Sequence, residues 1–104
     1  MKHLNVKIKA TVSVLDLSET GAPHVVKTDL FPNLFFNGNF YPSRVMRCAR
    51  IIEANEVGEA EIWMADNAEQ PSGLKHGDKF ELRAGPQYLL ANCVARDVVN
   101  EWHD

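Results

Sequence analysis

The sequence predicts an all-β fold, a barrel or sandwich of short strands. Apolar and polar residues alternate without a break over residues 4–14, which indicates a strand with one buried and one solvent-facing side. A polar turn follows at residues 16–23, and further alternating segments are separated by turns rich in glycine and proline. The chain has 104 residues, so we expect residues 1–104 to form a single domain around one core.

The middle of the chain predicts one long connection and then a hairpin. Residues 24–41 are rich in aromatic side chains but are interrupted by prolines and by an Asn-Gly-Asn turn. We expect a packed connection whose phenylalanines close one end of the core; the alternative is an aromatic binding patch on the surface. Residues 44–53 and 59–64 alternate again, and we expect them to pair through a turn at residues 55–58.

The C-terminal third predicts two more strands. Residues 66–77 read as a polar loop, and residues 79–83 alternate as a short strand. The last segment, residues 88–102, is ambiguous, because part of it alternates but four apolar residues recur at the spacing of an amphipathic helix: Leu90, Val94, Val98 and Trp102. The short strands elsewhere favour a strand here.

Composition excludes several function classes. With 11 Lys+Arg against 14 Asp+Glu, the net charge is −3, which argues against a general nucleic-acid-coating protein. No apolar run approaches the ~20 residues that span a bilayer, so we expect no membrane partner. The glycine-rich phosphate-binding motifs are absent, so no nucleotide and no other cofactor is expected. Two cysteines without a signal-peptide core suit reduced thiols and a cytoplasmic protein.

Neither a metal site nor a catalytic site is predicted. The potential metal ligands stand far apart, without the local pairs typical of zinc sites: His3, His24, Cys48, His76, Cys93 and His103. We interpret Cys48 and Cys93 as core thiols, which leaves a small cysteine-dependent enzyme as the disfavoured alternative. The carboxylates near the predicted hairpin turn are expected to be solvated: Glu53, Glu56, Glu59 and Glu61.

Two sets of side chains are candidates for binding a macromolecule. A large aromatic residue among outward glutamates can anchor a protein partner, which gives the first set: Trp63, Phe40, Tyr41, Arg44 and Arg47. A local basic stripe could instead contact the phosphates of RNA or tRNA, which gives the second set: Lys7, Lys9, Arg44, Arg47 and Arg83. We expect a protein partner, with RNA as the alternative.

Two stretches resemble the third, C-terminal domain of elongation factor Tu. Residues 73–87 (GLKHGDKFELRAGPQ) and the following LANCVA at 90–95 resemble the family's G-x-R-F-A-I-R-E-G-G-R and V-G-A-G-V-V, with matches at Phe80, Arg83 and Gly85. Residues 39–47 (NFYPSRVMR) are similar to that domain's N-Y-R-P-Q-F-Y-F-R, with matches at Pro42 and Arg47. The resemblance implies a stand-alone, six-stranded, antiparallel closed barrel and makes residues 88–98 a strand.

What the resemblance implies about function is binding without chemistry. In the family this barrel packs on the GTPase domain, helps to hold aminoacyl-tRNA and contacts the exchange factor. Pro86 and Gln87 replace the family's second glycine and following arginine, which argues against a tRNA role. We therefore expect a non-enzymatic, protein-binding module. The resemblance suits a translation-associated protein, and the size, the acidity and the lack of catalytic residues suit a bacterial immunity-type protein that masks a toxin.

Overall fold

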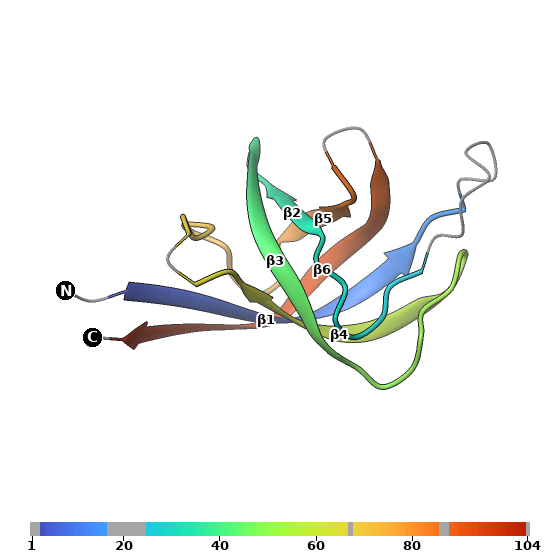
Figure 1. Cartoon of the computed structure of the whole chain (residues 1–104), viewed down its shortest axis with the longest axis horizontal. Helices are drawn as coiled ribbons and strands as arrows, with labels where there is room; N and C mark the ends of the chain where they lie inside the picture. Colours follow the sequence, from blue (N-terminus) through green and yellow to red (C-terminus); the bar gives the residue numbers. More distant parts are fainter. Residues whose placement is uncertain (1–2, 17–24, 67, 86–87, 104) are drawn as a thin grey trace.

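Six antiparallel strands form a closed barrel in the computed structural model, which describes residues 3–16, 25–66, 68–85 and 88–103 (Figure 1). The strands are β1 (His3–Val14), β2 (Asn33–Phe36), β3 (Asn39–Cys48), β4 (Val57–Met64), β5 (Lys79–Arg83) and β6 (Leu89–His103). Around the barrel they follow the order β1-β4-β3-β2-β5-β6, and β6 pairs again with β1 to close it. The predicted all-β fold and the six-stranded closed barrel are therefore confirmed, while the predicted turn at residues 16–23 lies largely outside the described residues.

Strand β6 settles the ambiguity between strand and helix. It pairs with β1 along almost its whole length and with β5 over its first half. Two extra residues interrupt its registers, Leu90 opposite β5 and Arg96 opposite β1. Each such bulge shifts the alternation of inward and outward side chains by one position. The bulge at Arg96 moves the inward face from Cys93 and Ala95 to Val98, so neither alternating set of apolar residues runs through the whole strand.

The expectation of an irregular connection over residues 24–41 is wrong in its second half. Strands β2 and β3 form a hairpin around Asn37 and Gly38, whose φ angles of 51° and 82° suit a two-residue turn. Pro42 is tolerated inside β3 because it pairs with Asn33 on one side and lies at the end of β4 on the other. Because proline has no N–H to donate to the Ala65 carbonyl there, this carbonyl accepts a hydrogen bond from Gln70 Nε2 at 3.1 Å instead.

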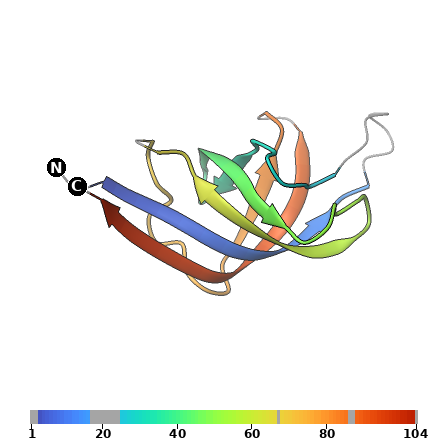
Figure 2. The ribbon, with the colours of Figure 1, turned by 60° about the horizontal axis from the view of Figure 1, so that its bottom comes forward.

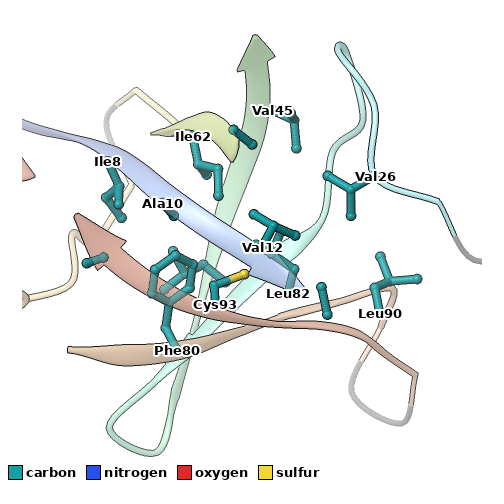
Figure 3. Packing of buried hydrophobic residues seen from close by; sticks show 14 of the residues in the cluster. Ile8, Ala10, Val12, Val26, Val45, Ile62, Phe80, Leu82, Leu90 and Cys93 are labelled. Carbon is teal, nitrogen blue, oxygen red and sulfur yellow. The ribbon is translucent and has the colours of Figure 1, made fainter. Parts of the chain in front are cut away.

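The core is mainly aliphatic, and the expected plug of phenylalanines is absent from the described segment. Phe31 is 72% exposed and Phe40 is 42% exposed, and of the phenylalanines in this segment Phe36 is the one that packs against the core. Inward side chains of all six strands, including Phe80 of β5, fill the barrel (Figure 3). The largest fully buried side chains are Ile8, Leu34, Ile52, Ile62, Leu82, Val6, Val12, Val26 and Val45.

Strand β3 also ends earlier than the predicted 44–53. A register shift near Met46 changes the alternation, and β3 stops at Cys48. Ile52 then returns to the core through an isolated bridge with Val26, which leaves Ile51 exposed. By contrast, the strand predicted at 79–83 has the bounds of β5, and the strand predicted at 59–64 lies within β4.

Strands β1 and β6 continue beyond the barrel as a two-stranded ribbon that ends near both termini (Figures 1 and 2). β4 pairs with β1 from Lys7 onwards, and β5 pairs with β6 only up to Val94. The β4–β5 connection packs along the free side of β1, where Gln70 Oε1 accepts the Val6 N–H at 2.9 Å. Among the described residues there is no helix long and apolar enough to cross a bilayer.

Candidate functional site

One row of outward side chains crosses four neighbouring strands. The registers place Val99 of β6 opposite Lys7 of β1, Lys7 opposite Trp63 of β4, and Trp63 opposite Arg44 of β3. Directly opposed residues on one face of antiparallel strands have Cβ atoms about 5 Å apart, so neighbours in this row are in reach of one another. Together with Phe31, which extends the row beyond Arg44, we call these five residues the Trp63 face.

Trp63 is held in place from two sides. Lys7 Nζ lies 3.7 Å from the centroid of the indole ring, and the same ammonium forms an ion pair with Glu101 at 2.6 Å. The indole Nε1–H donates a hydrogen bond to Glu61 Oε1 at 3.0 Å. The half-buried ring therefore has little rotamer freedom to lose when a partner binds, which lowers the entropic cost of binding.

Arg44 links the tryptophan to Phe31. Its guanidinium carbon lies 5.5 Å from the centroid of the Phe31 ring, and its Nη2 is 2.5 Å from Asp29 Oδ1. The backbone also joins these segments, since the Val45 N–H donates to the Leu30 carbonyl and the Asp29 N–H donates to the Val45 carbonyl. The loop before β2 thus presents an exposed aromatic ring beside the sheet face.

Two shallow grooves lie on either side of Trp63. The groove towards β6 has a volume of about 240 Å³ and is lined by Lys7, Trp63 and Val99 among others. The groove towards β3 has a volume of about 280 Å³, and Phe31, Arg44 and Trp63 are among its lining residues. Trp63 is the residue that both grooves share, so it forms a ridge between two recesses that side chains of a partner can enter.

The charges next to the Trp63 face alternate in sign. Glu61 of β4 stands opposite both Lys9 of β1 and Arg47 of β3, so a carboxylate lies between the two cations. Asp97 of β6 stands opposite Lys9 on the other side. This mixed rim suits recognition of a surface that carries both charges, as protein surfaces do, rather than a polyanion.

The predicted partner-binding residues divide into three groups. Trp63 and Arg44 lie together in the row, and Arg47 lies next to it. Phe40 faces outward on β3 four residues from Arg44, about 13 Å along the strand, and its ring packs against Phe35 at 4.8 Å. Tyr41 is only 5% exposed and belongs to the core, so including it as a surface contact is wrong.

Phe31 and Val99 are the two members of the Trp63 face that the sequence does not indicate. Phe31 is part of a segment expected to fill the core, and its path beside β3 depends on backbone hydrogen bonds to Val45 that no local pattern reveals. Val99 faces outward only because the extra residue Arg96 shifts the alternation of β6. The available signal was the aromatic richness of the segment, which supported a surface patch as the alternative interpretation.

The cations of the proposed basic stripe are brought together only in part, and most of them are paired. Lys7, Lys9, Arg44 and Arg47 share one outer face, whereas Arg83 lies on β5 over the Phe35 ring. Lys7, Arg44 and Arg83 form ion pairs with Glu101, Asp29 and Glu81. A phosphate would have to compete with these carboxylates.

Neither cysteine has the surroundings of an activated nucleophile. Cys93 is buried, and desolvation together with the nearby charge of Glu81 raises the pKa of its thiol well above the ordinary value. Burial also raises the pKa of the half-buried Cys48 thiol. Cys93 lines a groove of about 510 Å³ between β2, β5 and β6, and no histidine is among the residues that line it. Both shifts disfavour the thiolate that nucleophilic catalysis requires.

No candidate metal centre is found within the described ranges. There, no three histidine, cysteine or acidic side chains converge in a way that could hold an ion.

The chain matches no protein-family model, and no curated protein matches its sequence significantly.

Proposed function

We propose that this chain is a non-enzymatic module that binds a protein partner through the Trp63 face. The observation that carries the proposal is the tryptophan ridge, fixed by Lys7 and Glu61 and flanked by a groove on each side. Tryptophan and arginine dominate the binding energy of protein interfaces because they combine a large apolar surface with directed polar groups. An exposed phenylalanine at one end and a valine at the other complete an apolar strip within a charged rim.

A protein partner is favoured over RNA by the pattern of charge. Three of the five cations in the basic stripe already pair with carboxylates, and Glu61 separates two others. RNA binding gains much of its affinity when unpaired cations displace the counterions condensed on the phosphates, so this arrangement offers it little. The overall charge of −3 acts in the same direction.

The resemblance to the third domain of elongation factor Tu supports a narrower proposal. The matching positions include Phe80, which packs in the barrel core, and Pro42 and Arg47, which lie on β3. Within this proposal the module acts in the cytoplasm of a bacterium, as a small protein that masks a toxin or assists translation. The size and acidity of the chain are the support for it.

The test compares variants that differ in one exposed aromatic side chain. Wild type, Trp63→Ala, Phe31→Ala and Tyr88→Ala are immobilised and used to capture proteins from a bacterial lysate, and the bound protein is then titrated in purified form. We expect Trp63→Ala to weaken binding at least about 30-fold, as a central anchor does, and Phe31→Ala about 10-fold. Tyr88 is 50% exposed and lies just before β6, away from the face, so Tyr88→Ala should bind like wild type.

Two results would contradict the proposal. One is capture of the same proteins, with the same affinity, by Trp63→Ala. The other is a nuclease-sensitive ligand whose affinity falls steeply with salt, which would favour the RNA alternative.

A further inference from the structure

The outer edge of β6 is open along the ribbon. Beyond Val94, which is the last residue paired with β5, the β4–β5 connection bonds only to Ala95: the Ala95 N–H donates to the Asp78 carbonyl, and the Ala95 carbonyl accepts from the Gly77 N–H. From Arg96 onwards, no described strand or loop forms backbone hydrogen bonds to this side of β6. Figure 1 shows the ribbon leaving the barrel with β1 on one side of β6 and no strand on the other.

The hydrogen bonds of β1 show which backbone groups of β6 face the outer edge. The Val6 N–H points away from β6, towards Gln70 Oε1. Val6 and Asn100 are therefore a non-hydrogen-bonded antiparallel pair, and the N–H and C=O of Asn100 also point outward, away from β1. Because direction alternates along a strand, Val98 and Trp102 present their backbone groups to the same edge.

The side chains along this edge favour association. Trp102 is 63% exposed and pairs with the half-buried Leu4 of β1. Both side chains lie on the face of the ribbon that continues the inner face of the barrel. Of the two carboxylates of the segment, Glu101 forms an ion pair with Lys7, and Asp97 stands opposite the cationic Lys9 in the register of β1 and β6. Edge strands that avoid pairing normally carry uncompensated charge, proline or a bulge. The bulge at Arg96 precedes this segment, and residues 97–103 contain no proline and no further bulge.

We propose that a second copy of this chain pairs with the open edge, β6 against β6 in antiparallel orientation, with the two-fold axis at Asn100. This register pairs Asn100 with Asn100 of the partner subunit and Val98 with Trp102 of the partner subunit. It is the one symmetric register in which the three edge-facing residues all pair with one another, so that six backbone hydrogen bonds form. The exposed indole then lies against Val98 of the partner subunit.

Charge selects the same register. Moving the axis by one residue to Val99 sets Asp97 opposite Glu101 of the partner subunit, and moving it to Glu101 sets two glutamates opposite each other. Like charges directly opposed on a sheet are unfavourable. Moving the axis to Val98 brings Ala95 into the pairing, but its backbone groups are already bonded to the β4–β5 connection.

The first test measures self-association of the whole chain by sedimentation across micromolar to millimolar concentration. We expect a monomer–dimer equilibrium for wild type and for Asn100→Ala, which keeps the backbone donors. Asn100→Pro removes the N–H at the axis without removing a bond to β1, so we expect its dimer dissociation constant to rise at least about tenfold. Wild type that stays monomeric throughout, or Asn100→Pro that associates as wild type does, would overturn the proposal.

The second test reads the register directly. In a Cys48→Ser background, Asn100→Cys places two thiols at the axis, where paired Cα atoms are about 5.5 Å apart and a disulfide can form. Mild oxidation should cross-link this variant rapidly, whereas Ser72→Cys, an exposed position in the β4–β5 connection, should stay monomeric. Equal cross-linking of the two variants would contradict this register. Neither test involves the lysate partner, so its outcome is independent of the proposed function.

Discussion

Cys48 and Cys93 show how strongly burial separates two residues of the same type. Cys93 points into the barrel beside Phe80 and is almost fully enclosed (Figure 3), whereas Cys48 ends β3 and is partly accessible. For both thiols the pKa is raised, because the charged thiolate loses hydration on burial. The neutral thiol is thus the stable form of each at neutral pH.

Labelling with a thiol reagent tests whether the thiols of Cys48 and Cys93 are neutral and protected in the folded protein. We expect both cysteines to react more slowly than a free thiol at neutral pH, with Cys48 reacting before Cys93. The thiolate is the reactive species, and the pKa of the Cys48 thiol is raised. Labelling of Cys48 should therefore accelerate as the pH rises towards and beyond the ordinary pKa of a cysteine thiol. Cys48→Ser should leave only the slow Cys93 reaction, which should require unfolding. Rapid stoichiometric labelling at neutral pH would instead favour the cysteine-enzyme alternative.

Single residues were predictable from sequence where the alternation was undisturbed. Trp63 stands among outward glutamates in a regular strand, and its place on the outer face follows from that pattern. The sequence places Tyr41 on the surface because its strand, β3, is predicted to begin only at Arg44. Val99 was not proposed, because its direction depends on a bulge, and a bulge is set by tertiary pairing rather than by local sequence.

Strand β4 contains a glycine that the packing requires. Gly58 pairs with Val12 of β1, and a Cβ atom added there would lie 2.7 Å from Ile52 Cγ1 and 2.8 Å from Ile52 Cδ1. Ile52 is fully buried and held by its bridge to Val26, so it cannot move aside without disturbing the core. The absence of a side chain at position 58 thus allows the segment after β3 to close over β4.

Gly58→Ala should therefore destabilise the barrel. Overpacking of a core typically costs about 1–3 kcal/mol, which exceeds the roughly 0.5–1 kcal/mol that alanine gains from a less flexible unfolded chain. The free energy of unfolding from denaturant titrations measures the difference. In a double-mutant cycle, Ile52→Val removes Cδ1 and should make the combined loss smaller than the sum of the single losses. Full additivity, or a stabilised Gly58→Ala, would show that Ile52 is not the obstacle.

At the scale of elements, the sequence predicted strands well and the β2–β3 hairpin poorly. Pro42 and the aromatic residues around it suggested an irregular segment, because proline cannot donate to a ladder. The fold accommodates Pro42 where β4 ends and supplies Gln70 as a substitute donor to Ala65. This compensation comes from a residue 28 positions away (70 − 42), so no local pattern contains it.

The described part of the molecule consists of a closed barrel and a two-stranded ribbon that extends from it. The barrel closes where residues 9–14 of β1 pair with residues 91–97 of β6. The ribbon is formed where residues 3–6 of β1 pair with residues 100–103 of β6. The Trp63 face lies on the barrel and at the base of the ribbon, and the open edge of β6 lies on the ribbon itself. The proposed partner contacts outward side chains, whereas the proposed second copy bonds to the backbone edge of β6, and the two surfaces meet at Val99. The alternation over residues 4–14 predicts a long first strand. It does not predict that β1 extends beyond the end of its neighbour β4, because this depends on the length of β4.

Removal of the last five residues, 100–104, tests whether the two surfaces are independent. The shortened chain ends at Val99 and keeps every pair that closes the barrel, so we expect the same β-sheet circular dichroism and one cooperative unfolding transition. It loses the Lys7–Glu101 ion pair, a partly exposed contact worth at most about 1 kcal/mol. Self-association should disappear, because Asn100 and Trp102 are gone. Binding of a partner captured through Trp63 should persist but weaken, because Glu101 lines the groove towards β6 and pairs with Lys7. A folded, shortened chain that still dimerises would place the self-association surface elsewhere on the barrel, and one that loses the partner would show that the ribbon tip belongs to the binding face.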